Sequence, residues 1–393
     1  MGATMGSHGP GDPGTRPTTF MTSSSRGSSP AVTLLHWMRA RSTPPRLRRH
    51  GALRPVGAPV PLSGRYAIQG AQVRTGLELW ADYAGVPLLL EDDESGPARA
   101  ARLHAGLSAH GCRFVLGPYG SDSTRVVAKA APGSLLWNHG AAADDVQRLP
   151  AVVSVGSPAS RYLIALGRAI AALRPSASLA LVTASGTFAR FAREGIEQAA
   201  PALGLTIVAR FSFADDLARV AASRADAILA CSPLQAELAL LRPLASLRPC
   251  VLLGGVSPAL AAFPALLGRD PEGILAPVQC HPRLSGAAAL GPSSDEVVAA
   301  AWRSGRGAID SVAGQAYAVA LIARHCLELD PENPLAAAQR LETSTFFGAF
   351  ALDPESGIQR GHRLAVVRWR HGEQELILAD TEDPTTAFHR GQG

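Results

Sequence analysis

Three glycine-containing loops hold the side chains best suited to bind a small polar ligand. They span residues 61–70, 117–124 and 138–142, and each follows a short apolar run with the character of a strand. Each loop places hydroxyl or amide side chains near the start of a helix, where unpaired N–H groups and the positive end of the helix dipole favour a carboxylate, a phosphate or another polar group. A structural alternative stays open, in which the polar residues at 121–123 only cap the helix that follows.

Motifs for catalysis and for cofactor binding are missing from the predicted strand–helix junctions. No G-x-G-x-x-G fingerprint follows a predicted strand, and the chain contains no P-loop, no G-x-S-x-G elbow and no H-E-x-x-H pair. Of eleven histidines, only His139 lies in one of the three loops, where we expect it to hydrogen-bond a ligand or to be exposed rather than to act as a base. Cys280 and His281 have no nearby partner to complete a metal site. We therefore expect no catalytic residue, no cofactor and no metal.

An enzyme is the rival hypothesis from another functional class. It would use His139 with Asp144 or Asp145 as an acid–base pair, although adjacent acids also suit the N-terminus of a helix, where negative charge is favoured. The five cysteines are far apart, odd in number and without a C-x-x-C pair. We expect them to be buried or unreactive thiols rather than disulfides or zinc ligands.

The composition is that of a globular protein with a nearly neutral body. Of 393 residues, 47% are hydrophobic and 18% are charged, which excludes wholesale disorder, a collagen-like fibre and a disulfide-stapled miniprotein. The net charge of +5 is concentrated in residues 1–54, which hold eight arginines and one acid, so 29 basic and 31 acidic residues remain for the rest. Because a broad nucleic-acid surface needs clustered cations, we expect no nucleic-acid partner.

The two ends of the chain differ from this body. Gly, Pro, Ser and Thr make up 21 of the first 30 residues, so we expect residues 1–50 to be a disordered basic arm or, alternatively, a docking segment for an anionic surface. Residues 381–393 are expected to be a flexible tail. No apolar run reaches the roughly 18 residues of a transmembrane segment. The N-terminus has no signal-peptide pattern, which as written predicts a cytoplasmic protein.

Apolar runs of strand length alternate with longer segments of helical period from residue 53 onward. The first series predicts strands at Leu53–Val60, Val86–Leu90, Arg113–Leu116 and Ser134–Trp137, and helices at Ile68–Tyr83, Ala98–His110 and Ser121–Ala131. The second series, after Val152–Val155, predicts strands at Leu179–Thr183, Thr206–Phe211, Ala227–Ala230 and Cys250–Leu253, and helices at Ser157–Leu173, Thr187–Leu203, Asp216–Ser223 and Leu234–Leu247. Strands this apolar need helices on both faces. The predicted fold class is α/β, with two doubly wound parallel-sheet lobes of about five strands each.

The remaining chain completes the two lobes. It predicts a strand at Gly273–Val278, helices at Ser294–Arg303, Ile309–Leu329 and Pro334–Leu341, and a hairpin that pairs Leu364–Trp369 with Glu375–Ala379. In open parallel sheets, ligands bind at the carboxyl ends of the strands. The three glycine-containing loops lie at such ends.

With these elements and loops, the sequence resembles the type I periplasmic binding proteins, most closely the branched-chain amino acid/amide-binding (leucine-binding-protein-like) receptors of ABC importers. The likeness runs from Leu53 to Ala379. It is carried by Pro61-Leu62-Ser63-Gly64 with Gly70, by Gly117-Pro118 followed by Ser121-x-Ser123-Thr124, and by Gly348-Ala349-Phe350-x-Leu352-Asp353-x-x-x-Gly357, which leads to Gly361-His362 and a strand ending at Trp369.

The resemblance implies the periplasmic binding protein-like I fold, in which two lobes joined by three hinge crossings close over a small polar molecule. The lobes are expected to be residues 51–155 plus 279–345 and residues 156–278 plus 346–380. The hinges are then expected near Val155–Gly156, Val278–Gln279 and Thr345–Gly348.

Carried over by position, the resemblance also implies ligand contacts from both lobes. One lobe would contribute Gln69, the carboxylate-binding hydroxyl of Ser121, and His139 with Ala141. The other would contribute Phe188, Pro233 or Leu234, and Val256. With Asn138 from the same loop, and with Tyr66 and Tyr119 as flat walls, the expected ligand-binding set is Tyr66, Gln69, Tyr119, Ser121, Asn138, His139, Ala141, Phe188, Leu234 and Val256.

Three of these positions depart from the family pattern. Ala141 replaces a threonine, Phe188 a tyrosine, and Val256 the acid that pairs the ammonium group of an amino acid ligand. Since an unpaired ammonium group is costly to bury, the expected ligand is an amide, a small carboxylate or an aromatic acid, unless Asp122 or Asp144 supplies the missing acid.

The function that the resemblance implies is a non-enzymatic solute-binding protein that presents its small-molecule ligand to an ABC permease outside the cytoplasm. An alternative with the same fold is an intracellular ligand sensor that acts on a signalling partner.

Overall fold

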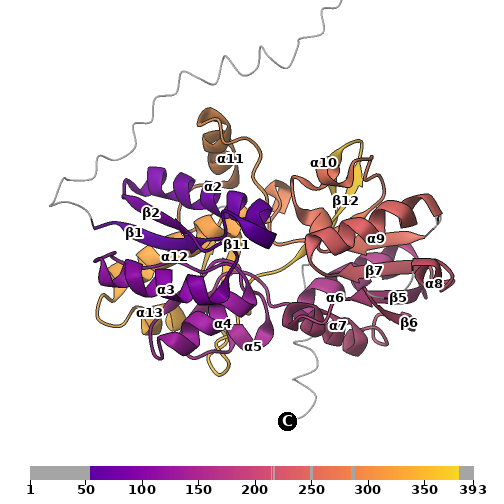
Figure 1. Ribbon diagram of the computed structural model, residues 1–393, viewed down its shortest axis with the longest axis horizontal. Coiled ribbons are helices and arrows are strands. Elements are labelled where there is room, and N and C mark those ends of the chain that lie inside the picture. The colour runs from indigo at the N-terminus through magenta and orange to yellow at the C-terminus, as the bar shows by residue number, and fades with distance from the viewer. Residues whose placement is uncertain (1–53, 214, 216, 248–250, 285–287, 380–393) are drawn as a thin grey trace, which may run out of the picture. The chain divides into compact units, whose positions relative to one another are not determined.

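The computed structural model (Figure 1) describes residues 54–213, 215, 217–247, 251–284 and 288–379. The expected arm at 1–50 and the expected tail at 381–393 lie outside these residues, as do Leu53, Asp216 and Cys250 at the ends of predicted elements. Residues 52–393 group into one unit by their contacts. Within that unit, two layered arrangements of strands and helices can be told apart.

The first arrangement contains two parallel sheets of two short strands each. β1 (Val56–Val60) pairs with β2 (Leu88–Asp92), and β3 (Leu136–Asn138) pairs with β4 (Val152–Ser154). The segment predicted as the strand Arg113–Leu116 lies between β1 and β3 but is held there by two single bridges rather than a ladder. Every residue of β1 is buried, as expected of a strand covered on both faces.

Helices from both ends of the described chain pack around these strands. They are α2 (Ala67–Ala84), α3 (Pro97–Ala109), α4 (Ser121–Ala130), α5 (Asp144–Gln147), α11 (Ser294–Arg303), α12 (Ser311–Leu329) and α13 (Pro334–Arg340), and the hairpin of β10 (Thr343–Thr345) and β11 (Gly348–Phe350) follows them. α2 and α12 approach so closely that a Cβ atom at Gly76 would lie 2.1 Å from the carbonyl oxygen of Ala313. Glycine at position 76 therefore allows α12 to pack against the N-terminal elements.

The second arrangement is a seven-stranded sheet in the order β13-β12-β9-β8-β7-β5-β6. Its parallel strands are β5 (Ser178–Thr183), β6 (Thr206–Ser212), β7 (Ala227–Cys231), β8 (Leu252–Gly255) and β9 (Leu275–Val278). β12 (Ala365–Arg370) joins β9 in antiparallel orientation and pairs with β13 (Glu373–Ala379) at the edge. The predicted hairpin is thus confirmed, and because it extends this sheet the strand number is seven instead of about five.

The helices of the second arrangement follow its strands along the chain. They are α6 (Ser160–Leu173), α7 (Thr187–Ala199), α8 (Leu217–Ala221), α9 (Leu234–Leu247) and α10 (Phe263–Leu267), with the short turn η3 (Ser257–Ala259) after β8. None of the helices that the structure describes combines the length and the apolar character needed to cross a membrane.

The apolar core is divided between the two arrangements. One cluster joins β1, α2 and α12, and another lies on β5, α6 and α7. Phe346, Phe347, Phe350 and Leu352 belong to the first cluster, and the ring of Phe346 packs against Tyr317 of α12 at 5.1 Å between centroids. The segment 346–352 therefore packs with the first arrangement, whereas the sequence predicts it for the second lobe.

Three passages connect the two arrangements, at residues 155–157, 278–280 and 362–364. The last differs from the predicted crossing at Thr345–Gly348. The phenylalanines after Thr345 fill space beside α12, so the chain leaves the first arrangement only after His362.

A glutamine fastens the passages to one another. Oε1 of Gln279 accepts the N–H of Ser157 at 2.9 Å, and its Nε2 donates to the Ser157 carbonyl at 3.3 Å and to the hydroxyl of Tyr162 at 2.5 Å. The hydroxyl of Ser157 donates in turn to the carbonyl of His362 at 3.1 Å. All three passages thus meet in one buried hydrogen-bonded cluster.

Candidate functional site

An open cavity of about 430 Å³ lies between the two arrangements. Its first wall comes from the turn η2 (Gly64–Tyr66), the start of α2, the loop before α4 and the start of α12. Its second wall comes from the loops that follow β5, β7 and β8, which are carboxyl ends of parallel strands. The size and the position of the cavity suit a small molecule.

Most of the predicted ligand-binding residues line this cavity. They are Tyr66, Gln69, Tyr119, Ser121, Phe188, Leu234 and Val256. Pro233, the alternative to Leu234, lines it as well. Contact of these residues with a ligand stays a prediction.

Asn138 and Ala141 do not line the cavity, because both are fully buried in the loop after β3. Nδ2 of Asn138 donates to the carbonyl of Ala141 and to the hydroxyl of Ser154, each at 2.7 Å. Its Oδ1 accepts the N–H groups of Gly140 at 3.0 Å and of Ala141 at 2.7 Å. The amide therefore shapes the loop, and neither residue is among those that line the cavity.

His139 is also buried, so it is not an exposed loop residue, and it is not among the residues that line the cavity. Neither ring nitrogen has a hydrogen-bond partner within the described residues, and the ring stacks on Tyr119 at 6.5 Å between centroids. Burial lowers the pKa of His139 to about 4. The neutral imidazole supports Tyr119 from behind, which the sequence could not distinguish from a role in binding.

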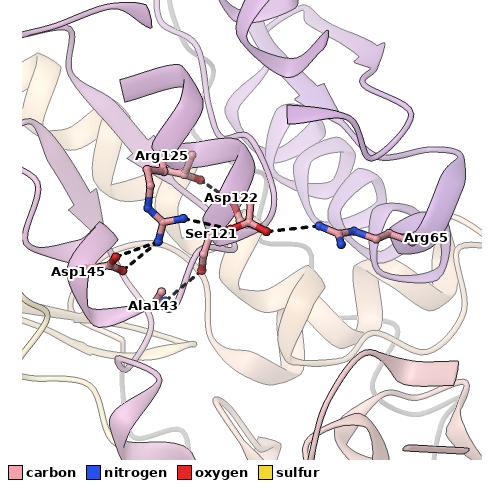
Figure 2. A network of polar contacts seen from close by, with 8 residues as sticks. Arg65, Ser121, Asp122, Arg125, Ala143 and Asp145 are labelled. Carbon is pink, nitrogen blue, oxygen red and sulfur yellow. Dashed lines mark hydrogen bonds and ion pairs between the residues drawn. The ribbon is translucent and has the colours of Figure 1, made fainter. Parts of the chain in front are cut away.

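Ser121 is the first residue of α4, and Gly120 occupies the N-cap position. No side chain caps this helix, so the capping alternative is wrong. Instead, Oγ of Ser121 accepts the N–H of Ala143 at 3.1 Å (Figure 2). This contact does not use the hydroxyl hydrogen, and Ser121 lines the cavity.

A chain of charges borders the cavity on the side of Ser121. Arg125 donates to Asp122 at 3.0 Å and to Asp145 at 2.9 Å, and Arg65 lies 3.7 Å from the other Asp122 oxygen (Figure 2). Arg65 and Asp122 line the cavity with side chains that are about half exposed. Because two arginines already neutralise Asp122, it is poorly suited to pair a ligand ammonium group.

Asp144 is buried and away from the cavity lining. Its carboxylate accepts the N–H of Ser160 at 3.0 Å and the hydroxyl of the same residue at 2.6 Å. Neither Asp144 nor Asp145 hydrogen-bonds His139, so the acid–base pair of the enzyme hypothesis is not formed.

Two aromatic pairs face the cavity, one from each arrangement. Tyr66 and Tyr119 meet edge to face at 5.5 Å, and Tyr162 and Phe188 meet edge to face at 5.1 Å. Burial raises the pKa of all three tyrosine hydroxyls, that of Tyr162 to about 12. They are therefore neutral donors and acceptors at physiological pH.

The cavity also holds polar residues that the sequence did not single out. Gln279 and Gln315 line it and are more than nine-tenths buried, and Tyr162 and Arg65 line it as well. Within the described residues, Oε1 of Gln69 is buried without a hydrogen-bond partner. The sequence offered a signal only for Arg65, which lies in the first glycine-containing loop. Gln279 lies in a chain crossing, and Gln315 and Tyr162 lie inside helices, where polarity alone does not indicate a site.

The family model for periplasmic binding protein matches residues 55–374. The chain belongs to the periplasmic binding protein family. The solved structures that resemble the chain have the type I fold that the motifs implied. A comparison with the curated proteins finds no match.

Solved structures of this fold resemble the chain at low sequence identity. A solute-binding protein of an ABC transporter from R. palustris, in complex with benzoate, is 19% identical with a TM-score of 0.69, and the match covers 83% of this chain and 96% of that one. The branched-chain amino acid transporter protein LivJ from Streptococcus pneumoniae, in complex with isoleucine, is 15% identical with a TM-score of 0.71 and coverage of 83% and 100%. A leucine-binding protein from Thermotoga maritima is 16% identical with a TM-score of 0.70 and coverage of 83% and 98%.

As a member of the periplasmic binding protein family, the chain is a binding protein rather than an enzyme. The expectation of a cytoplasmic protein finds no support, because members of the family are periplasmic.

Proposed function

We propose that this protein binds a small aromatic carboxylate in the cavity by closing two lobes over it, and that it presents the ligand to an ABC permease. The observation that carries the proposal is the pair of aromatic couples on opposite walls, Tyr66 with Tyr119 and Tyr162 with Phe188. Flat rings on two sides suit a flat apolar body, and their hydroxyl groups suit its polar substituents.

The start of α4 supports an anionic end on this ligand. Ser121 has a hydroxyl hydrogen available, and the first turn of the ten-residue helix α4 presents unpaired N–H groups. Arg65 adds a positive charge at the rim, held by Asp122 at the long distance of 3.7 Å. A carboxylate at this place would be bound by the neutral donors of Ser121 and of the first turn of α4, with the positive charge of Arg65 at the rim of the cavity.

The opposite wall argues against an amino acid ligand. Val256 stands where a free acid is needed for an ammonium group, and Asp122 is already neutralised by two arginines. A charge buried without a partner costs several kcal/mol in a closed site. The R. palustris protein with bound benzoate shows that this fold accommodates such a ligand, whereas LivJ was solved with isoleucine.

Closure is proposed to occur by bending at the three passages, 155–157, 278–280 and 362–364. The lobes would then be residues 51–155 plus 279–361 and residues 158–278 plus 365–379. Ligand binding would shift the balance from open toward closed.

Isothermal titration calorimetry with benzoate, benzamide and isoleucine tests the proposal. We expect benzoate to bind more tightly than benzamide and isoleucine to bind least. Phe188→Ala should weaken benzoate binding by about 1–2 kcal/mol, since the variant loses an aromatic contact and buried apolar area. Phe211→Ala, which removes a phenyl ring beside Arg219 and outside the cavity, is the matched control. Preference for isoleucine, or equal effects of the two variants, would refute the proposal.

A further inference from the structure

A buried carboxylate lies directly behind the second wall of the cavity. Glu237, in the first turn of α9, has no exposed surface. Its Oε1 accepts the N–H of Ser232 at 2.9 Å and that of Val256 at 3.4 Å, and its Oε2 accepts the N–H of Ser257 at 2.7 Å. All three donors belong to residues that line the cavity, whereas Glu237 itself does not.

These hydrogen bonds join two loops that are separate in the sequence. Ser232 follows β7, and Val256 with Ser257 follows β8. The carboxylate comes this close because residue 255 is glycine: a Cβ atom at Gly255 would lie 2.8 Å from Oε2 of Glu237. One side chain thus sets the spacing of two ligand-facing loops.

The partners of this carboxylate are backbone N–H groups and the side chain of Ser257, and not a cation. Burial raises the pKa of Glu237 to about 7 in spite of the hydrogen bonds. The titratable group that faces it is the thiol of Cys231 at the end of β7, whose pKa burial and the Glu237 charge both raise, so the thiol stays neutral. The loops that pack on Glu237 contribute no other titratable side chain to this contact.

An ionised group in this position works against stability at neutral pH. A carboxyl group whose folded pKa lies above its ordinary value favours the folded state most below about pH 4.5, and that contribution is lost as the pH rises through 7. A neutral glutamine of the same shape would avoid this loss, but its amide nitrogen would donate where one carboxylate oxygen accepts an N–H. The carboxylate is therefore better explained by its hydrogen bonds to the loops after β7 and β8 than by a contribution to the stability of the fold.

We propose that Glu237 is a positioning residue for ligand binding, whose ionised carboxylate clamps the loops after β7 and β8 and makes ligand affinity depend on pH. The inference rests on the proposed function in so far as these loops close on the ligand. When Glu237 is protonated, one oxygen becomes an O–H donor and a weaker acceptor for the N–H groups around it. The clamp then loosens, and the second wall loses its fixed geometry.

The variant Glu237→Gln tests this proposal against Glu194→Gln, a matched control on the surface of α7 where Glu194 pairs with Arg190. The probe is benzoate, titrated by calorimetry between pH 6 and pH 8.5. We expect the wild type and the control to bind about tenfold more tightly at pH 8.5 than at pH 6, as for the loss of one hydrogen bond to a charged group. Glu237→Gln should bind weakly throughout, with a flat profile.

Asp310 is the other acid beside the cavity with a raised pKa, about 6, which is caused by burial. It caps α12 and also accepts the N–H of Ala261 at 3.3 Å. Since Asp310 is retained in Glu237→Gln, a pH dependence of affinity that persists in that variant would be assigned to Asp310 and would overturn the proposal.

A readout without ligand separates this inference from the proposed function. In amide NMR spectra of the ligand-free protein, the signals of Ser232, Val256 and Ser257 should titrate together with a midpoint near the pKa of Glu237, about 7, and should lose this transition in Glu237→Gln. At pH 8, thermal unfolding of Glu237→Gln should occur at or above the wild-type temperature. Unchanged benzoate affinity, amide signals that do not titrate, or a variant that loses stability together with affinity would each overturn the proposal. If the wild type does not bind benzoate, the proposed function fails. The amide titration then still tests whether the ionised carboxylate of Glu237 holds the loops after β7 and β8 together.

Discussion

Replacement of Ser121 by alanine isolates the contact that the proposed carboxylate makes with α4. Oγ of Ser121 accepts the N–H of Ala143 at 3.1 Å, a contact that does not use the hydroxyl hydrogen, and Ser121 lines the cavity. A hydrogen bond to a charged acceptor contributes about 1.5–3 kcal/mol, and the lower end applies because Ser121 is partly exposed. The Kd for benzoate should therefore rise roughly tenfold in Ser121→Ala.

The assay compares two ligands and two variants at pH 7.5 by calorimetry. Benzamide offers a neutral acceptor, for which a hydrogen bond contributes only about 0.5–1.5 kcal/mol, so Ser121→Ala should weaken benzoate binding more than benzamide binding. Ser304→Ala is the matched control, because that hydroxyl donates within the end of α11 and lies outside the cavity. Urea unfolding of the ligand-free variants measures the separate effect of leaving the Ala143 N–H unpaired.

One outcome would contradict a role of Ser121 in ligand binding. If Ser121→Ala binds both ligands like the wild type but unfolds at lower urea concentration, the hydroxyl only fastens α4 to the loop before α5. The anion-binding end of the cavity would then have to be sought elsewhere.

Three other substitutions test the fold that positions the site. Gln279→Ala should lower the free energy of unfolding by about 2–3 kcal/mol, measured by urea denaturation, because it removes buried hydrogen bonds to a backbone segment and to Tyr162; an unchanged midpoint would contradict the cluster at the passages. His139→Leu should remove a loss of about 3 kcal/mol that the wild type undergoes as the pH falls from 6.5 to 4, since the folded protein keeps this imidazole neutral while the unfolded chain protonates it. Parallel pH–stability curves for the two proteins would exclude this role. Gly76→Ala should lower the unfolding temperature by several degrees, measured by calorimetry, because its Cβ would lie 2.1 Å from the Ala313 carbonyl oxygen; a wild-type temperature would mean that α2 and α12 separate without cost.

The α/β alternation could be predicted because buried parallel strands and amphipathic helices leave strong local patterns. The helices Leu234–Leu247 and Ser294–Arg303 have the predicted bounds. The segment predicted as the strand Arg113–Leu116 forms only single bridges to its neighbours in the structure. A local apolar pattern cannot show how many backbone pairs a segment forms with neighbouring strands. The third passage was misplaced for a similar reason, because phenylalanines that fill space beside α12 have the same local pattern as residues of the second lobe.

The candidate site was harder to predict than the fold. Loop position and residue type indicated Ser121 and Phe188, which line the cavity, but equally indicated Asn138 and His139, which turn inward. The direction of a polar side chain depends on the backbone of its own loop, as the hydrogen bonds of Asn138 show. Glu237 gave no signal, since one acid in the first turn of a helix is the ordinary pattern at an exposed N-terminus.

The hydroxyl of Tyr162 links the cavity to the place where the chain crosses. It accepts a hydrogen bond from Gln279, and Gln279 accepts the N–H of Ser157. A ligand that accepts a hydrogen bond from the Tyr162 hydroxyl would therefore join a continuous chain of hydrogen bonds, each of which polarises the next. Ligand binding would then act directly on the passages between the two arrangements, and no other element would have to transmit the effect. Substitutions at Tyr162, Gln279 and Ser157 should consequently occur together in related proteins, because replacing Gln279 removes the hydrogen bonds that it forms with both of the other residues.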